Sequence, residues 1–66
     1  MISFEKLWDK ADELGVSQYK MHEEGISNST ITRLKRNQHV NTESIDKLCH
    51  LLHCKVEDIM EYIDNE

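Results

Sequence analysis

The sequence is poor in residues that interrupt helices. Its 66 residues include no proline and only two glycines, and its aromatic residues are limited to one Phe, one Trp and two Tyr. This scarcity disfavours a turn-rich β-sheet and favours helices joined by short connections. With 66 residues, we expect a single domain, residues 1–66, around one small core.

No segment has the pattern of a membrane anchor or an export signal. None of the apolar runs approaches the roughly 20 residues that cross a bilayer. The opening residues also lack the basic start and the apolar centre of a signal peptide. We therefore expect a cytoplasmic protein that has no membrane partner.

The net charge of −5 is spread unevenly along the chain. Residues 1–16 carry a net charge of −2 and residues 40–66 carry −5, whereas residues 17–39 carry +2. The acidic total argues against nucleic acid as a partner, because most proteins that bind nucleic acid are basic overall. A local positive segment can nevertheless guide docking onto phosphates, while the acidic remainder limits non-specific binding.

Apolar residues at helical spacing predict two helices in the part of the chain that precedes Gly25. The first helix is capped by Ser3 and ends at Gly15, because glycine accepts the left-handed backbone of a helix C-terminus. Its core-facing stripe comprises Phe4, Leu7, Trp8, Ala11 and Leu14. Ser17 can cap a second helix that runs from about residue 18 to residue 23 or 24, and Gly25 then allows a sharp turn.

The same spacing predicts three more helices. Ser27 caps the third, from about residue 28 to 36, and Thr42 caps the fourth, which ends near residues 54–55. The core-facing residues of the fourth are Ile45, Leu48, Cys49, Leu51 and Leu52. A fifth helix begins near Val56, with Ile59, Met60, Tyr62 and Ile63 on its apolar side, and residues 64–66 are expected to fray. No segment alternates with a period of two, so the prediction is an all-α, five-helix domain without strands.

The second and third predicted helices form a helix-turn-helix around Gly25. Ile31 and Leu34, three residues apart, would dock the third helix on its partner helix. Its open side carries side chains that can bond a base edge or a phosphate: Asn28, Ser29, Thr32, Arg33 and Arg36, followed by Lys35 and Asn37. A short polar helix with basic residues toward its end is what a helix-turn-helix presents to the DNA major groove.

The run Ser27–Thr30 could have a purely structural role. Hydroxyl and amide side chains at a helix start are good caps, so capping accounts for one or two of the four residues. The free N–H groups of the same helix end also attract phosphate. Capping does not account for Arg33 and Arg36 along the same helix, so we favour the DNA-facing interpretation.

The segments SQ at 17–18, GIS at 25–27 and STITRLK at 29–35 resemble the phage-repressor helix-turn-helix family, the Cro-like or XRE group. The tail LCHLLHCKVEDIMEYI is similar to a common continuation in small bacterial members, and the resemblance covers nearly the whole chain. It implies a lambda-repressor-like DNA-binding domain. It further implies base contacts by Asn28, Ser29, Thr32 and Arg33, and phosphate contacts by Gln18, Ser27, Lys35, Arg36, Asn37 and Gln38.

The sequence departs from the family pattern in the second helix. The family usually has a Leu five residues before the turn glycine and an Ala four before it, whereas this chain has Lys20 and Met21. We therefore expect a second helix that is shorter than usual or that ends in a tighter turn.

Cys49, His50, His53 and Cys54 form the pattern CHxxHC, which invites a zinc interpretation. Structural zinc sites usually draw their ligands from two separated segments. Here all four residues fall within one helix end, where Cys49 and His53 share one face and His50 and Cys54 share another. We expect no metal and no disulfide, with Cys49 as a small core residue.

The function predicted from these patterns is sequence-specific DNA binding by a transcriptional regulator, a repressor that acts as a homodimer on a palindromic operator. No nucleophile–base set is convincingly spaced, so no enzyme activity, cofactor or small-molecule ligand is expected. The alternative is a protein-interaction or antitoxin-like module that uses the acidic last helix as its contact face. That helix could also form the dimer contact, or only complete the core.

Overall fold

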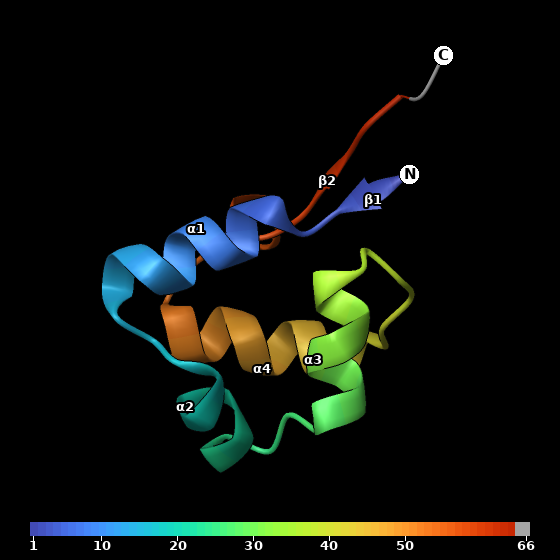
Figure 1. Ribbon diagram of the computed structural model, residues 1–66. Coiled ribbons are helices and arrows are strands. Elements are labelled where there is room, and N and C mark those ends of the chain that lie inside the picture. The colour runs from blue at the N-terminus through green and yellow to red at the C-terminus, as the bar shows by residue number, and fades with distance from the viewer. Residues whose placement is uncertain (65–66) are drawn as a thin grey trace.

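The computed structural model describes residues 1–64 and contains four α-helices and one short β-ribbon (Figure 1). The helices are α1 (Glu5–Leu14), α2 (Gln18–Glu23), α3 (Asn28–Lys35) and α4 (Thr42–Leu52), each close to its predicted position. Figure 1 shows α4 in the centre of the helical body, with α1 alongside it. Within residues 1–64 no helix has the length and apolar character needed to cross a membrane.

The prediction of a fifth helix is wrong. The chain makes only a single 3-10 turn, η1 (Val56–Asp58), and then becomes the extended strand β2 (Glu61–Tyr62). Helices of so few residues are held by packing rather than by propensity, so a competing long-range pairing can replace them. The acidic helical face on which the protein-interaction alternative depended is therefore absent from the described residues.

The prediction of no strands is also wrong, because β2 pairs with β1 (Ile2–Ser3) near the other end of the chain. The pairing is antiparallel, with Ile2 opposite Tyr62 and Ser3 opposite Glu61. Met1 and Ile63 extend it by exchanging two hydrogen bonds of 2.7 Å. Figure 1 shows this terminal ribbon, β1 with β2, projecting from the helical body. Residues 65–66, to which part of the fraying prediction applied, lie outside the described part of the chain.

The core is formed by one apolar side of each α-helix, by Phe4 and Ile26 in the connections, and by Ile59 directly after η1. Its buried members are Phe4, Leu7, Ala11, Met21, Ile26, Ile31, Leu34, Ile45, Leu48, Leu52 and Ile59. Trp8, Cys49 and Leu51 pack against this core while remaining half-buried. Leu14, which was predicted to face the core, is instead exposed in the last turn of α1. Tyr62 and Ile63 are exposed on the ribbon.

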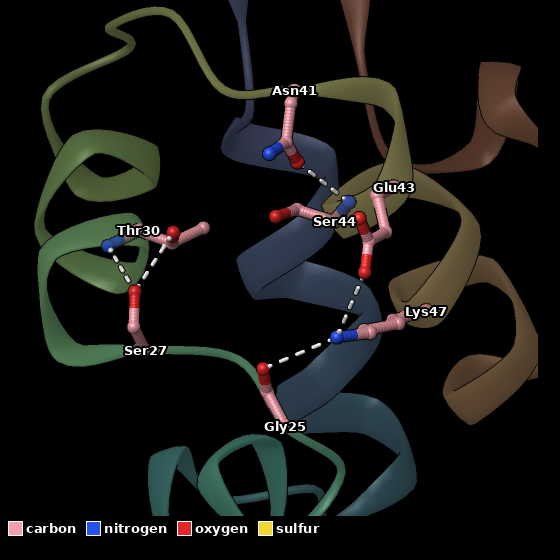
Figure 2. Close-up of polar contacts among 7 residues, drawn as sticks. All are labelled: Gly25, Ser27, Thr30, Asn41, Glu43, Ser44 and Lys47. Atoms are coloured by element: carbon pink, nitrogen blue, oxygen red, sulfur yellow. Dashed lines mark hydrogen bonds and ion pairs between the residues drawn. The ribbon is translucent and has the colours of Figure 1, made fainter.

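Side chains cap three of the four helices at their N-termini. Ser17 Oγ accepts a hydrogen bond from Lys20 N (3.3 Å), and Ser27 Oγ accepts one from Thr30 N (3.2 Å), as predicted. The fourth cap is Asn41 rather than Thr42, with Asn41 Oδ1 accepting from the N–H of Ser44 at 2.9 Å (Figure 2). The predicted Ser3 cap is also wrong. Phe4 is the N-cap residue of α1, and the Ser3 hydroxyl bonds the N–H of Glu5.

All four α-helices end in the same hydrogen-bonded motif. Each is followed by a residue with a positive φ, namely Gly15 (70°), Gly25 (92°), Asn37 (55°) and His53 (51°). In each case the N–H of this residue bonds the carbonyl three residues back, and the next N–H bonds the carbonyl five back. This is the Schellman motif, which satisfies carbonyls that the helix leaves unpaired. Two glycines are enough for the chain because Asn and His take the other two left-handed positions.

Candidate nucleic-acid interface

The turn between α2 and α3 fixes how the two helices meet. Gly25 has a φ of 92°, and the next residue, Ile26, is buried in the core. The N–H of Ile26 bonds the carbonyl of Met21 at 3.1 Å, which closes the turn against the end of α2. A left-handed residue and a buried anchor in succession reverse the chain sharply, so α3 leaves the turn in a defined direction.

A lysine of α4 supports this turn from the outside. Lys47 Nζ donates to the carbonyl oxygen of Gly25 at 3.4 Å and lies 3.5 Å from Glu43 Oε1 (Figure 2). A Cβ atom at position 25 would come within 3.3 Å of Lys47 Nζ. Position 25 therefore favours glycine for its φ, and a Cβ there would require only a small shift of the Lys47 side-chain end. Lys47 was not among the predicted site residues, although its spacing of four from Glu43 is a readable ion-pair signal.

Helix α3 is held by two buried residues and keeps its opposite side free. Ile31 and Leu34 are both buried, as predicted. At 100° per residue, positions 29, 32, 33 and 36 fall on the side opposite these two anchors, and position 28 lies at the edge of that side. All four predicted base-contact residues are exposed there: Asn28, Ser29, Thr32 and Arg33. Five of the six predicted phosphate-contact residues are exposed as well: Gln18, Ser27, Lys35, Arg36 and Gln38.

Among the described residues, the cations along α3 and at its end have no internal ion pair. Within residues 1–64 the two ion pairs are Lys6 with Glu61 and Lys47 with Glu43, and neither involves the helix. Arg33, Lys35 and Arg36 are thus available to an external anion. Such unpaired positive charges on one exposed helix are the electrostatic footprint of a phosphate-binding surface.

The start of α3 is pre-ordered by a small hydroxyl network. Ser27 Oγ accepts from the N–H of Thr30 and donates to Thr30 Oγ1 at 3.0 Å (Figure 2). Ser29 Oγ lies 3.1 Å from the same Ser27 oxygen. The capping role that the sequence suggested for Ser27 is therefore real, and Asn28 and Ser29 are presented on an ordered first turn.

Asn37, predicted as a phosphate contact, also has a structural task. It is half-buried in the left-handed position after α3, and its Oδ1 accepts a hydrogen bond of 2.7 Å from the N–H of Phe4. This bond joins the end of α3 to the start of α1, 33 residues away. A sequence pattern gives no signal for such a contact, because it depends on how the two helix ends meet.

The comparisons with known proteins decide the family. A model of the Cro/C1-type HTH DNA-binding domain matches residues 6–65. The chain belongs to this family. A similar solved structure is the crystal structure of the transcriptional regulator VanUg in its form II. It superposes with a TM-score of 0.85 at 28% sequence identity, over 94% of this chain and 84% of that one. No curated protein matches the chain significantly.

In this Cro/C1-type domain, α2 and α3 are the helix-turn-helix of a DNA-binding protein. The departure from the family pattern is resolved by a six-residue α2 in which Met21 is fully buried and Lys20 is exposed. Met21 thus supplies the buried position four residues before Gly25. The first helical residue is Gln18, as the resemblance requires.

The CHxxHC cluster lies at the other end of α4. His53 is the left-handed C-cap residue of this helix, and among residues 1–64 no group of three or more His, Cys, Asp or Glu could hold a metal ion. The N–H of Cys54 bonds the carbonyl of Cys49 at 3.1 Å as part of the helix-ending motif. Burial and the neighbouring Cys54 raise the pKa of the Cys49 thiol. A raised pKa makes this thiol a poorer nucleophile at neutral pH.

Proposed function

We propose that this chain is a transcriptional repressor that binds a palindromic operator as a homodimer, with α3 in the DNA major groove. The main support for this proposal is the outward side of α3, which is exposed, polar and cationic and is free of ion pairs within the described residues. The similarity to a protein described as a transcriptional regulator supports regulation of transcription as the role. Occupation of a promoter would block RNA polymerase sterically.

The proposed division of contacts follows the chemistry of each side chain. Base edges would be read by Asn28, Ser29, Thr32 and Arg33, which lie along the outward side of α3. Phosphates would be held by Arg36, at the end of that side, and by residues that flank it, namely Gln18, Ser27, Lys35, Asn37 and Gln38. Arg33 is the main candidate for specificity, because a guanidinium can bond O6 and N7 of one guanine together.

The ordered turn before α3 supports this assignment of contacts, because it holds the helix in one orientation. A recognition helix whose first turn is already ordered binds more favourably, because each side chain that must become ordered lowers the free energy gained. Here Ser27 caps α3, Gly25 and Ile26 set its direction, and Lys47 supports the turn from α4. The helix is therefore presented to DNA in a fixed orientation.

The test is a selection of bound duplexes from a random DNA pool, with the parent protein at two salt concentrations. We expect a recovered palindrome whose half-sites lie about one helical turn apart. Arg33→Ala should relax base preference at one position in each half-site, whereas Arg36→Ala should weaken all sequences alike. No enrichment at either salt concentration would overturn DNA recognition, and equal site preferences of Arg33→Ala and the parent would overturn the role of Arg33.

A further inference from the structure

Beside the helix-turn-helix lies a second surface feature, an open apolar groove of about 670 Å³. It runs between the terminal ribbon, the connection after α3 and the face of α4. Its apolar lining includes Met1, Ile2, Val40, Ile45, Val56 and Met60. We infer that this groove and the terminal ribbon together form the surface through which a second copy of this chain binds. The inference rests on the proposed function only for the two-fold arrangement of the two copies.

Exposed apolar side chains gather at this one place. Seven large apolar residues are exposed among the described residues, and five of them line the groove or extend the ribbon: Met1, Ile2, Val56, Tyr62 and Ile63. The other two, Leu14 and Tyr19, are on α1 and α2 and belong to neither the groove nor the ribbon. Scattered apolar residues need no explanation, but a contiguous patch marks an interaction surface.

The terminal ribbon adds exposed apolar surface beside the groove. Its two strands have two residues each, and an isolated two-stranded ribbon is marginally stable in water. Ile2 and Tyr62 are directly opposite each other, so their side chains lie on the same face. Ile2 lines the groove, so the exposed ring of Tyr62 extends the apolar surface outward from it.

The position of the groove suits a second copy that reads the other half of a palindrome. The groove begins at Asn37–Val40, directly after α3. The chain measures 38 × 23 × 17 Å, whereas two recognition helices must lie about 34 Å apart on one face of the DNA. Contact through a surface next to α3 is compatible with this spacing, and the groove is the apolar surface that directly follows α3.

Charge and area also fit a self-association. Copies of a chain with a net charge of −5 repel each other, so they approach most easily through uncharged surface. The five exposed apolar residues carry no side-chain charge. If these five residues became fully buried in both copies, the interface would bury roughly 1,000 Å² of accessible surface in total, near the lower limit for a specific interface. We therefore expect a weak dimer in solution that is completed on DNA.

Two matched pairs of variants test the interface. Val56 and Leu14 are both 49% exposed, and Tyr62 and Tyr19 are 71% and 72% exposed. Val56→Glu and Tyr62→Glu place an acid in the patch, whereas Leu14→Glu and Tyr19→Glu place the same charge outside it. Sedimentation of the whole chain up to about 500 μM should show a parent dimer. Both patch variants should raise its dissociation constant more than tenfold, and the controls less than twofold, with unchanged circular dichroism spectra.

Binding to duplexes recovered from the random pool separates this inference from the proposed function. Patch variants should bind a half-site duplex as the parent does but lose cooperative binding to the palindrome. In another outcome, the parent binds no duplex while its dimer is still broken only by the patch variants. That result would support the interface and overturn the proposed DNA binding. A parent that stays monomeric at the highest of these concentrations and binds palindromes singly would overturn the interface, as would patch variants that dimerise normally. A monomer that binds an apolar dye in a Val56-dependent way would assign the groove to a small ligand instead.

Discussion

Replacement of Asn37 offers the sharpest test of how the recognition helix is anchored. Asn37 has two separable roles: it adopts a left-handed backbone with a φ of 55°, and its Oδ1 accepts the N–H of Phe4 at 2.7 Å. Asn37→Ala removes the acceptor and keeps a Cβ in the strained conformation. Asn37→Gly removes the acceptor but relieves the strain, and Asn37→Asp keeps both an acceptor oxygen and a residue that tolerates this conformation.

The magnitudes follow from the two roles. Phe4 is buried, so the loss of the acceptor leaves an unsatisfied backbone N–H that costs about 1–3 kcal/mol. Alanine in the left-handed region adds about 1 kcal/mol, which glycine avoids. We expect the free energy of unfolding to fall by about 2–4 kcal/mol in Asn37→Ala and about 1–3 kcal/mol in Asn37→Gly. Asn37→Asp should stay within about 1 kcal/mol of the parent, because charged acceptors make hydrogen bonds at least as strong.

Urea denaturation followed by circular dichroism measures these differences directly. A domain of 66 residues has a total stability of roughly 3–10 kcal/mol, so the expected losses shift the midpoint clearly. If the alanine and glycine variants both unfold with the free energy of the parent, the proposed contribution of the Asn37–Phe4 bond is refuted. A glycine variant that is more stable than the parent would show that only the backbone conformation matters at this position.

Three other predictions concern two left-handed residues at helix ends and the thiol of Cys49. Gly25→Ala should lower the free energy of unfolding by about 1–2 kcal/mol, and most of this loss should persist in a Lys47→Ala background, since the φ of 92° and not the 3.3 Å approach dominates it. His53→Gly should raise the free energy of unfolding by about 0.5–1 kcal/mol, because it relieves a left-handed residue at an exposed helix end; a lower melting temperature would contradict this. Iodoacetamide should alkylate Cys49 more slowly than Cys54 at pH 8, because the raised pKa of Cys49 lowers its thiolate fraction; equal rates by mass spectrometry would contradict it.

The parts of the fold that the sequence predicted are those set by near neighbours. Ser17 and Ser27 cap α2 and α3, and Gly15 and Gly25 end α1 and α2, because each acts on residues within one helical turn. Ile31 and Leu34 were readable as the buried side of α3 from their spacing alone. The assignment of the fourth cap to Thr42 instead of Asn41 is the one-residue uncertainty that all helix boundaries carry.

The terminal ribbon could not be predicted because its cause lies at the opposite end of the sequence. The residues after η1 carry an apolar pattern that suits a short helix equally well, and strands of two residues have no period to detect. What turns the chain into β2 is the pairing of Ile2 with Tyr62, together with the contact of Lys6 Nζ with Glu61 Oε2 at 3.4 Å. Asn37 and Lys47 are similar cases, because both bond to segments that are distant in the sequence.

The placement of the lysines and arginines explains how an acidic chain can present a DNA-binding helix. Within residues 1–64, Lys6 and Lys47 are bound to acids of the same chain, where they fix the ribbon and the turn before α3. In the part of the chain that the structure describes, the cations along α3 and at its end, Arg33, Lys35 and Arg36, have no such pairs. If Lys35 and Arg36 each neutralise one phosphate per protomer, a dimer should show a slope of about −4 in a plot of log affinity against log salt concentration. Arg36→Ala should reduce the slope by about 2, whereas an unchanged slope would show that the acidic remainder of the chain, and not this helix, sets the electrostatics of binding.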